Sequence, residues 1–336
     1  MKQIVWKKVG WLMCLSMVFS GVWAQNGTDF QNYCKERAQS AASIAVEGAD
    51  GWYFLKSELR HLGAGDFWGD AAAKTAQCKD PKAQDPLQAI VAYDKALKAE
   101  KIKLLLVPIP PKAVIYPEKL ADGNFTSGTR YDASLQRFYQ ELKKQGVEVL
   151  DLTPLFLSKK KGLTEPLYCL GDSHFSGEGA KVAAQAIAGK LKSYGISGSK
   201  SYTEKTSDLT FTGDLYKSLA KGYSETRKLH FISGDPVADK ASPVLLFGDS
   251  HTLVFDAGGD MFASQAGLAS NLACALQMPV EVIGVRGSGA TPSRINVYRR
   301  SKADPSFLKQ KKVFVWCFSA REFTEASSWS SQVPLK

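Results

Sequence analysis

The tetrapeptide GDSH occurs twice in the chain, at residues 171–174 and 248–251. Serine, histidine and aspartate can together perform nucleophilic catalysis, in which the histidine takes the serine proton and the aspartate orients the histidine. The second copy directly follows the apolar segment 243–247, so its serine is expected on a sharp turn at the end of a buried strand. We therefore predict that Ser250 is the nucleophile, with its backbone N–H facing a developing oxyanion.

The first copy lies in a different context, because no apolar strand precedes it and a helix is expected to open at Gly177. This context favours His174 as general base and Asp172 as the residue that fixes its tautomer. Three alternatives stay open: Ser250 caps a helix, the two Asp–His pairs bind a metal ion, or His251 is the base. We expect no metal and no cofactor, and a histidine next to the serine in sequence usually points away from its hydroxyl.

Two later segments offer candidates for oxyanion stabilisation or substrate binding. Gly287 lies in a glycine-rich turn after the apolar segment 280–285, where its N–H could point into the site. Arg321 follows the apolar segment 312–318 and could bind a substrate carboxylate or brace the site. The alternatives are a plain turn at Gly287 and a surface ion pair of Arg321, for example with Glu322.

The chain alternates between apolar segments and helical patterns, and these elements must position the candidate residues. We expect strands at 103–109, 147–152, 243–247, 280–285 and 312–318, and helices at 131–145, 177–193 and 267–278. Such alternation predicts a mostly parallel sheet covered by helices on both faces, with its site at the carboxyl ends of the strands. The Ser-, Gly- and Lys-rich stretch 195–208 is expected to be a long loop.

The composition predicts a packed globular protein, since 44% of the 336 residues are hydrophobic and 23% are charged. No apolar run in the body of the chain is long enough to span a bilayer. The net charge of +10 would suit an acidic polymer, although lysine clusters such as those at 159–161 and 309–312 are most often solvated surface. We expect no nucleic-acid partner.

The first residues have the pattern of an export signal. Three lysines precede the apolar stretch 9–22, and Ala24 is followed by polar residues, so we expect cleavage after Ala24 or retention of the segment as a membrane anchor. The remaining chain, 25–336, then contains five cysteines. Thiols outside the cytoplasm tend to pair, and Cys34 and Cys78 are the expected disulfide because both precede the first clear strand.

Six motifs in order resemble the periplasmic alginate O-acetyltransferases and related SGNH-like polysaccharide acetyltransferases. They are GADGWYFL at 48–55, VPIPPK at 107–112 with YP at 116–117, GVEVLDL at 146–152, DSH at 172–174, GDS at 248–250 and WCFSAR at 316–321. In this family the Asp–His motif precedes the serine, the reverse of ordinary SGNH esterases, and this chain has the same order. The resemblance implies an SGNH-hydrolase-like three-layer α/β fold with a mostly parallel central sheet and catalytic motifs in permuted order.

The resemblance also implies a function. It suggests an O-acetyltransferase in the periplasm that acetylates Ser250 and passes the acetyl group to hydroxyls of an exported polysaccharide. The implied acetyl donor is a membrane-bound O-acyltransferase partner. Some members carry a C-terminal carbohydrate-binding module, but this chain ends at Lys336, soon after Arg321, so we expect one acetyltransferase domain over 25–336 without that module. A carbohydrate esterase that deacetylates a glycan and a non-catalytic glycan-binding assembly protein are the alternatives.

Overall fold

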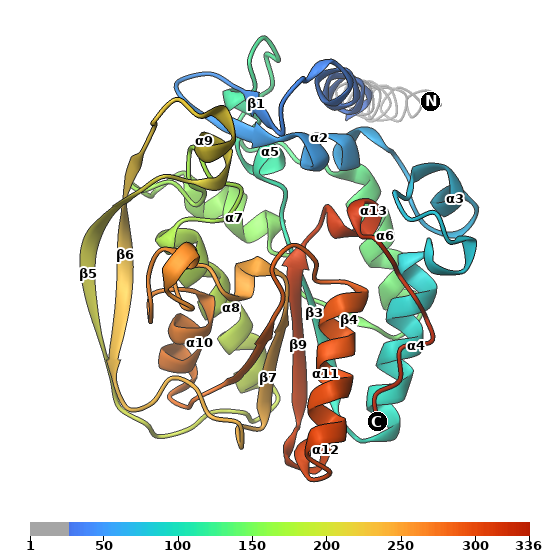
Figure 1. The fold of residues 1–336 in the computed structure, drawn as a ribbon, viewed down its shortest axis with the longest axis vertical. Coiled ribbons are helices and arrows are strands. Elements are labelled where there is room, and N and C mark those ends of the chain that lie inside the picture. Colours follow the sequence, from blue (N-terminus) through green and yellow to red (C-terminus); the bar gives the residue numbers. More distant parts are fainter. Residues whose placement is uncertain (1–26) are drawn as a thin grey trace, which may run out of the picture.

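The computed structural model describes residues 27–336, so the expected export signal at 1–24 lies outside the described residues. Its centre is a five-stranded sheet, in which every neighbouring pair of strands is parallel (Figure 1). In spatial order the strands are β4 (Glu148–Val149), β3 (Lys103–Ile109), β9 (Val313–Ser319), β7 (Val244–Gly248) and β8 (Glu281–Gly284). All five expected strands are therefore confirmed, although β4 is shorter than predicted.

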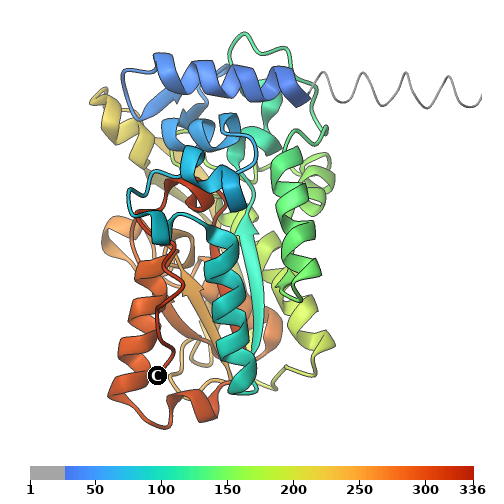
Figure 2. The same cartoon turned by 90° about the vertical axis from the view of Figure 1, so that its right-hand side faces the viewer.

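Helices cover both faces of this sheet, as the alternation of elements predicts (Figures 1 and 2). One face packs against α8 (Gly177–Ser193) and α10 (Leu268–Leu276), and the other against α4 (Pro86–Ala99), α6 (Ala133–Lys144) and α11 (Thr291–Ala303). The shorter helices are α2 (Lys56–Gly63), α3 (Ala72–Thr75), α5 (Lys112–Ile115), α7 (Thr153–Lys160), α9 (Asp214–Leu219), α12 (Phe307–Gln310) and α13 (Glu322–Glu325).

The two faces of β9 build two separate cores, because successive side chains of a strand point to opposite sides. Val313, Val315 and Cys317 belong to the core under α8 and α10. Phe314, Trp316 and Phe318 belong to the aromatic core under α4 and α11. Since neither face meets water, the strand is apolar from Val313 to Phe318, and this is why a continuous apolar run marked it in the sequence.

The stretch 195–208 contradicts the expectation of a long loop. From Tyr202 it forms β5 (Tyr202–Phe211), which pairs antiparallel with β6 (Glu225–Gly234) in a two-stranded ribbon beside the main body (Figure 1). Residues 203–208 are all polar and exposed, so no apolar alternation announced the strand. The far end of β5 leads into α9, close to the first GDSH copy.

The N-terminal part lies across the carboxyl end of the sheet (Figures 1 and 2). It comprises the helical residues 27–40, α2, and the antiparallel pair β1 (Ala45–Glu47) and β2 (Tyr53–Leu55). Among residues 27–336, no helix is both long and apolar enough to cross a membrane.

The expectation of a disulfide between Cys34 and Cys78 is wrong, because all five cysteines in the described part of the chain are free. Cys34 is fully buried in the core beneath the helical residues 27–40. Cys78 follows α3, and its thiol donates to the carbonyl oxygen of Asp80 at 3.6 Å. The two thiols lie in different surroundings. That both cysteines precede the first clear strand in the sequence did not indicate that they are close in space.

Candidate active site

Ser250 lies on a tight turn that directly follows β7, at the carboxyl edge of the sheet. Gly248 makes this turn possible, since a Cβ there would lie 1.6 Å from the carbonyl oxygen of Cys317 on β9. Asp249 ties the turn down by accepting the N–H of His251 at 2.9 Å and the N–H of Ser319 at 2.7 Å. Within residues 27–336 the N–H of Ser250 itself has no acceptor, so it is available to a ligand.

The structure brings together the three residues predicted as a triad. His174 Nε2 lies 2.7 Å from Ser250 Oγ, and His174 Nδ1 lies 2.6 Å from Asp172 Oδ1. Because the carboxylate can only accept, Nδ1 carries the proton and Nε2 is the acceptor for the serine hydroxyl. His251 lies beside His174 with its ring tilted by 60° and the ring centroids 4.8 Å apart, and it makes no hydrogen bond to Ser250. The geometry therefore favours His174 over His251 as the partner of the serine.

The two GDSH copies adopt the same local turn. In each, the aspartate Oδ1 accepts the backbone N–H of the histidine two residues later at 2.9 Å and also faces its Nδ1. The ring contact is 2.6 Å between His174 and Asp172 but 3.2 Å between His251 and Asp249. The tetrapeptide thus encodes an Asp–His turn, and its surroundings decide what each copy does.

Burial and charge act in opposite directions on the first pair. Burial disfavours the charged form of Asp172, but the charge of His174 and the hydrogen bonds from His174 and from the N–H of Asp214 hold the pKa of this carboxyl well below its usual value. Burial also disfavours the imidazolium of His174, but the charge and hydrogen bond of Asp172, with smaller contributions from Asp214 and Asp249, raise its pKa. This pair is therefore arranged to stabilise an imidazolium.

The surroundings of the second histidine, His251, lower its pKa instead of raising it. Burial lowers the pKa of His251, and the neighbouring charges of His174 and Arg321 lower it further, against the opposing effect of Asp249. A neutral His251 beside His174 avoids two like charges in one buried site.

The remaining predicted residues, Gly287 and Arg321, form no hydrogen bond with the nucleophile turn within the described residues. Gly287 is exposed, has φ +87, and its N–H has no acceptor within the described residues. Gly289 approaches more closely, because a Cβ there would lie 3.0 Å from the N of Asp249. Arg321 is half-buried directly after β9, and within residues 27–336 its guanidinium has no ion-pair partner. The surface ion pair with Glu322 is therefore absent.

Lys112 is a buried cation that the sequence analysis did not assign to the site, although it ends the VPIPPK motif. Its ammonium donates to the carbonyl oxygens of Tyr53 at 2.6 Å, Leu170 at 2.9 Å and Asp172 at 3.2 Å. Burial lowers its pKa, and nearby carboxylates, first of all Glu225, oppose this effect. Lys112 thus anchors the backbone on both sides of Gly171.

Glu225, at the start of β6, anchors the same segment from another side. Its carboxylate accepts the N–H groups of Leu170 at 2.8 Å and Gly171 at 2.9 Å, and Arg227 pairs with it at 2.8 Å. Nothing in the local sequence marked this residue, because its partners are backbone groups some fifty-five positions away.

Asp172, His174 and Asp214 lie close enough together to be considered as metal ligands. Their acceptor atoms already face donors, however: Asp172 accepts His174 and the N–H of Asp214, and Asp214 accepts the N–H and hydroxyl of Ser173. This pattern favours a hydrogen-bonded network over a cation site.

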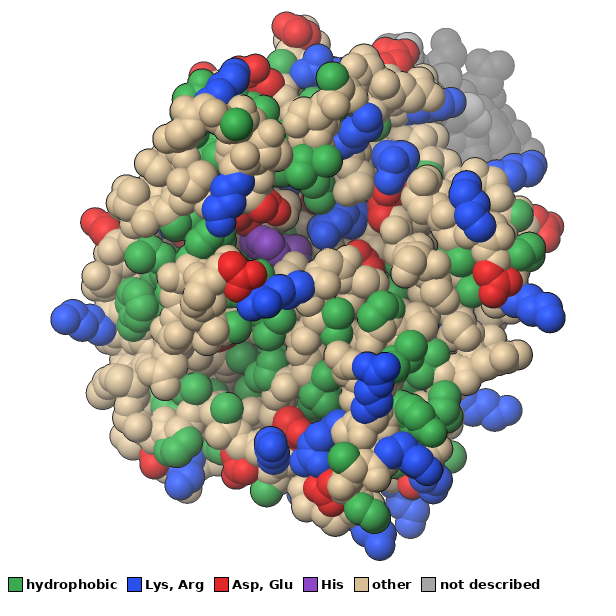
Figure 3. All heavy atoms as spheres, in the orientation of Figure 1, with side chains coloured by type: hydrophobic (Ala, Val, Ile, Leu, Met, Phe, Trp, Pro, Cys, Tyr) green, Lys and Arg blue, Asp and Glu red, His purple; other side chains and the backbone are tan. Residues whose placement is uncertain are grey.

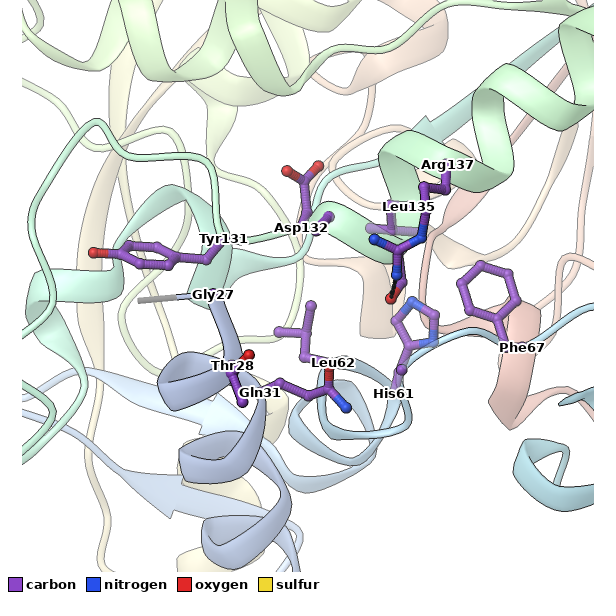
Figure 4. A pocket seen from close by; sticks show the side chains of 13 residues that line it. Gly27, Thr28, Gln31, His61, Leu62, Phe67, Tyr131, Asp132, Leu135 and Arg137 are labelled. Atoms are coloured by element: carbon purple, nitrogen blue, oxygen red, sulfur yellow. Dashed lines mark hydrogen bonds between the residues drawn. The ribbon is translucent and has the colours of Figure 1, made fainter. Parts of the chain in front are cut away.

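The face of the molecule in Figure 3 is hollowed where a histidine side chain reaches the surface, between acidic and basic side chains. A separate hollow of about 310 Å³ lies between the helical residues 27–40, α2 and α6 (Figure 4). It is lined by His61 and Arg137 among others, and by none of the predicted site residues. Burial lowers the pKa of His61 to about 3, so this histidine is neutral and unsuited to proton transfer at ordinary pH.

A parallel α/β sheet with a serine–histidine–aspartate line at its carboxyl edge defines a class, the SGNH-hydrolase-like proteins. Within this class, residues 45–320 match the family described as "SGNH hydrolase-like domain, acetyltransferase AlgX". The chain belongs to this family of SGNH-like acetyltransferases.

Two relatives are both named "Probable alginate O-acetylase AlgJ". The one from Pseudomonas syringae pv. tomato is 30% identical over 225 residues, which cover 62% of this chain and 51% of the relative. The one from Pseudomonas aeruginosa is 24% identical over 202 residues, which cover 59% of this chain and 43% of the relative. The chain therefore matches about half the length of these relatives.

Solved structures with the same architecture confirm the predicted fold. The O-acetyltransferase domain of Pseudomonas putida AlgJ has a TM-score of 0.62 and 21% identity, over 86% of this chain and 95% of that one. Pseudomonas aeruginosa AlgX has a TM-score of 0.59 and 18% identity, over 87% of this chain and 66% of that one.

Proposed function

We propose that this protein is an O-acetyltransferase that carries an acetyl group on Ser250 and delivers it to hydroxyl groups of an exported polysaccharide. The observation that carries the proposal is the continuous line from Asp172 through His174 to Ser250, with contacts of 2.6 and 2.7 Å. Membership of the acetyltransferase family supports the choice of acetyl as the transferred group.

In the first half-reaction, His174 Nε2 takes the hydroxyl proton of Ser250 as Oγ attacks the acetyl carbonyl carbon. The carbonyl π electrons move to the oxygen and form a tetrahedral oxyanion. Collapse of this intermediate breaks the bond to the donor, whose leaving group takes the proton from His174. Asp172 stabilises the imidazolium while it exists and holds the ring in the tautomer that accepts at Nε2.

In the second half-reaction, a sugar hydroxyl replaces the leaving group. His174 takes the proton of that hydroxyl, the sugar oxygen attacks the acetyl-serine carbonyl, and the proton returns to Ser250 Oγ as the serine leaves. Water in place of the sugar would make the same site an esterase. The free N–H of Ser250 is the first oxyanion donor, and Gly287 is the second candidate because its N–H also has no acceptor within residues 27–336.

Arg321 is the candidate substrate-binding residue of this proposal. Its half-buried guanidinium lies at the carboxyl edge of the sheet and forms no salt bridge with a carboxylate of the described residues. It can therefore bind an anionic or hydroxyl-bearing group of a ligand. The proposal places the protein in the periplasm, with a membrane-bound O-acyltransferase as acetyl donor and alginate or a related polymer as acceptor. The printed names of the relatives support the polymer class.

Intact-protein mass spectrometry after brief exposure to p-nitrophenyl acetate tests the mechanism. We expect the wild type to gain one acetyl group, Ser250→Ala to gain none, and added oligosaccharide to discharge the wild-type adduct with formation of acetylated sugar. Ser207→Ala is the control, since it removes an exposed serine of β5 that lies outside the triad, and it should still form the adduct.

Three results would contradict the proposal in different ways. An adduct on Ser250→Ala would move the nucleophile elsewhere. Discharge to water alone, with every oligosaccharide left unacetylated, would indicate an esterase. A folded wild type that forms no adduct and yet binds the oligosaccharide would indicate a non-catalytic glycan-binding protein.

A further inference from the structure

Residues 213–216, which form the start of helix α9 just after the ribbon strand β5, pack directly on the first GDSH turn. The N–H of Asp214 donates to Asp172 Oδ2 at 2.8 Å. In return, the Asp214 carboxylate accepts the N–H of Ser173 at 2.7 Å and its hydroxyl at 2.5 Å. The N–H of Tyr216 donates to the carbonyl oxygen of Gly171 at 3.0 Å. Three consecutive residues of the turn therefore have a partner in this short segment.

The fit between the two segments depends on two glycines. A Cβ at Gly213 would lie 2.3 Å from the carbonyl oxygen of Gly171 and 2.6 Å from the Cβ of Asp172. A Cβ at Gly171 would lie 2.3 Å from the ring of Tyr216. At Gly213 backbone meets backbone without an intervening side chain, and at Gly171 the backbone lies directly against the Tyr216 ring.

We propose that Asp214 is a positioning residue for the acyl-transfer reaction, which holds the Asp172–His174 turn through Asp172 and Ser173 so that His174 Nε2 is aimed at Ser250 Oγ. The inference rests on the proposed function, because it assigns Asp214 a role in the same proton transfer. Asp172 alone cannot fix the turn, since its Oδ1 is occupied by His174 and its Oδ2 depends on the N–H that Asp214 presents.

Asp214 also acts on His174 through its charge. The titratable groups that face His174 are Asp172 on its own segment, Asp214 at the start of α9, and Asp249 and His251 after β7. Asp214 is one of the carboxylates that raise the pKa of His174, and burial next to Asp172 raises its own pKa. A second carboxylate behind the pair should therefore favour the imidazolium that forms when Ser250 loses its proton.

The variant Asp214→Asn separates charge from shape, because an amide is nearly isosteric with a carboxylate and keeps an oxygen that accepts the N–H of Ser173. The backbone N–H that serves Asp172 is retained as well. Asp208→Asn is the matched control: it makes the same charge change on strand β5, which leads to Asp214, at an exposed site paired with Lys228. Both variants are compared with the wild type by ¹⁵N-histidine NMR titration of the resting protein and by the pH profile of p-nitrophenyl acetate turnover.

For Asp214→Asn we expect the His174 titration to move to lower pH, the acid limb of kcat/KM to move in the same direction, and kcat to fall about tenfold or more with KM unchanged. Asp208→Asn should leave both the titration and kcat where they are in the wild type. A His174 titration and a kcat that are both unchanged in Asp214→Asn would overturn the proposal. A fall in kcat without any shift of the titration would also overturn it, since lost folding alone would have that effect.

If Asp214→Asn does not fold, Ser173→Ala supplies the second test, because it removes one hydrogen bond to Asp214 and changes no charge. A lower kcat with an unchanged KM and an unchanged melting temperature would support the positioning role, and wild-type kcat would refute it. The NMR titration needs no turnover, so it still reports on Asp214 if the mass-spectrometric experiment shows that Ser250 carries no acetyl group. Failure of the proposed function and failure of this inference are thereby distinguishable.

Discussion

Replacing Lys112 with methionine should destabilise the protein strongly, although the change is nearly isosteric and removes a charge from the core. Lys112 is only 2% exposed, and its ammonium is the donor to three carbonyl oxygens. It also lies 5.2 Å from the centre of the Trp52 ring, in a cation–π arrangement. Methionine keeps the side chain up to the position of Cε but lacks the terminal ammonium, so it supplies none of these interactions.

The magnitude follows from the fate of the three carbonyls. The oxygen of Leu170 keeps a hydrogen bond from the N–H of Tyr53 at 2.9 Å, so its loss is partial. The oxygens of Tyr53 and Asp172 lose a charged donor in a buried place, and an unmet buried acceptor costs about 1–3 kcal/mol. Relief from burying the ammonium offsets part of this cost. We therefore expect a loss of about 3 kcal/mol in the free energy of unfolding, a large share of the 5–15 kcal/mol typical of a folded domain.

Urea denaturation followed by tryptophan fluorescence measures this difference, with Lys228→Met as the control. Lys228 is half exposed and pairs with the exposed Asp208, so its replacement should cost far less stability than that of Lys112. Equal free energies of unfolding for the two variants would refute the reasoning, because they would mean that the buried ammonium contributes no more than a surface one.

The remaining predictions concern the turn, the thiols and pH. Gly248→Ala should prevent folding, because its Cβ would clash with β9, whereas Gly287→Ala should cost about 1–2 kcal/mol for its positive φ alone; soluble yield and thermal melts compare them. Thiol titration of the protein from residue 27 onward should label Cys274 first, since it alone of the five described cysteines is not buried. All five thiols should react after unfolding without a reductant, and a count of three would instead reveal a disulfide. His230 bonds carboxylates from α8 and β5, which raise its pKa, so its contribution to stability should be complete below the pKa of an unfolded histidine and should disappear as the pH rises through the folded value. Unfolding free energies of wild type and His230→Gln should therefore converge at alkaline pH, and a gap that is constant from pH 5 to 9 would count against the ion pairs.

The sequence by itself determined which segments form the central sheet and which residues lie at its carboxyl edge. Buried parallel strands are apolar along their whole length, so 103–109 and 312–318 could be recognised without a partner. The serine after such a strand could be placed at the carboxyl edge, and the duplicated GDSH could be read as an Asp–His turn in one copy and a nucleophile turn in the other. Each of these features depends on residues that are neighbours in the sequence, so the sequence alone could indicate it.

Only the tertiary structure decided what holds the turn in place. The exposed strand β5 has no apolar alternation, so its residues resembled a loop, yet it delivers Asp214 to the first GDSH copy. Glu225 and Lys112 bind backbone groups that any residue would offer, and such bonds leave no mark on the partner's sequence. The difference between His174 and His251 arises in the same way, because identical tetrapeptides meet different neighbours once the chain is folded.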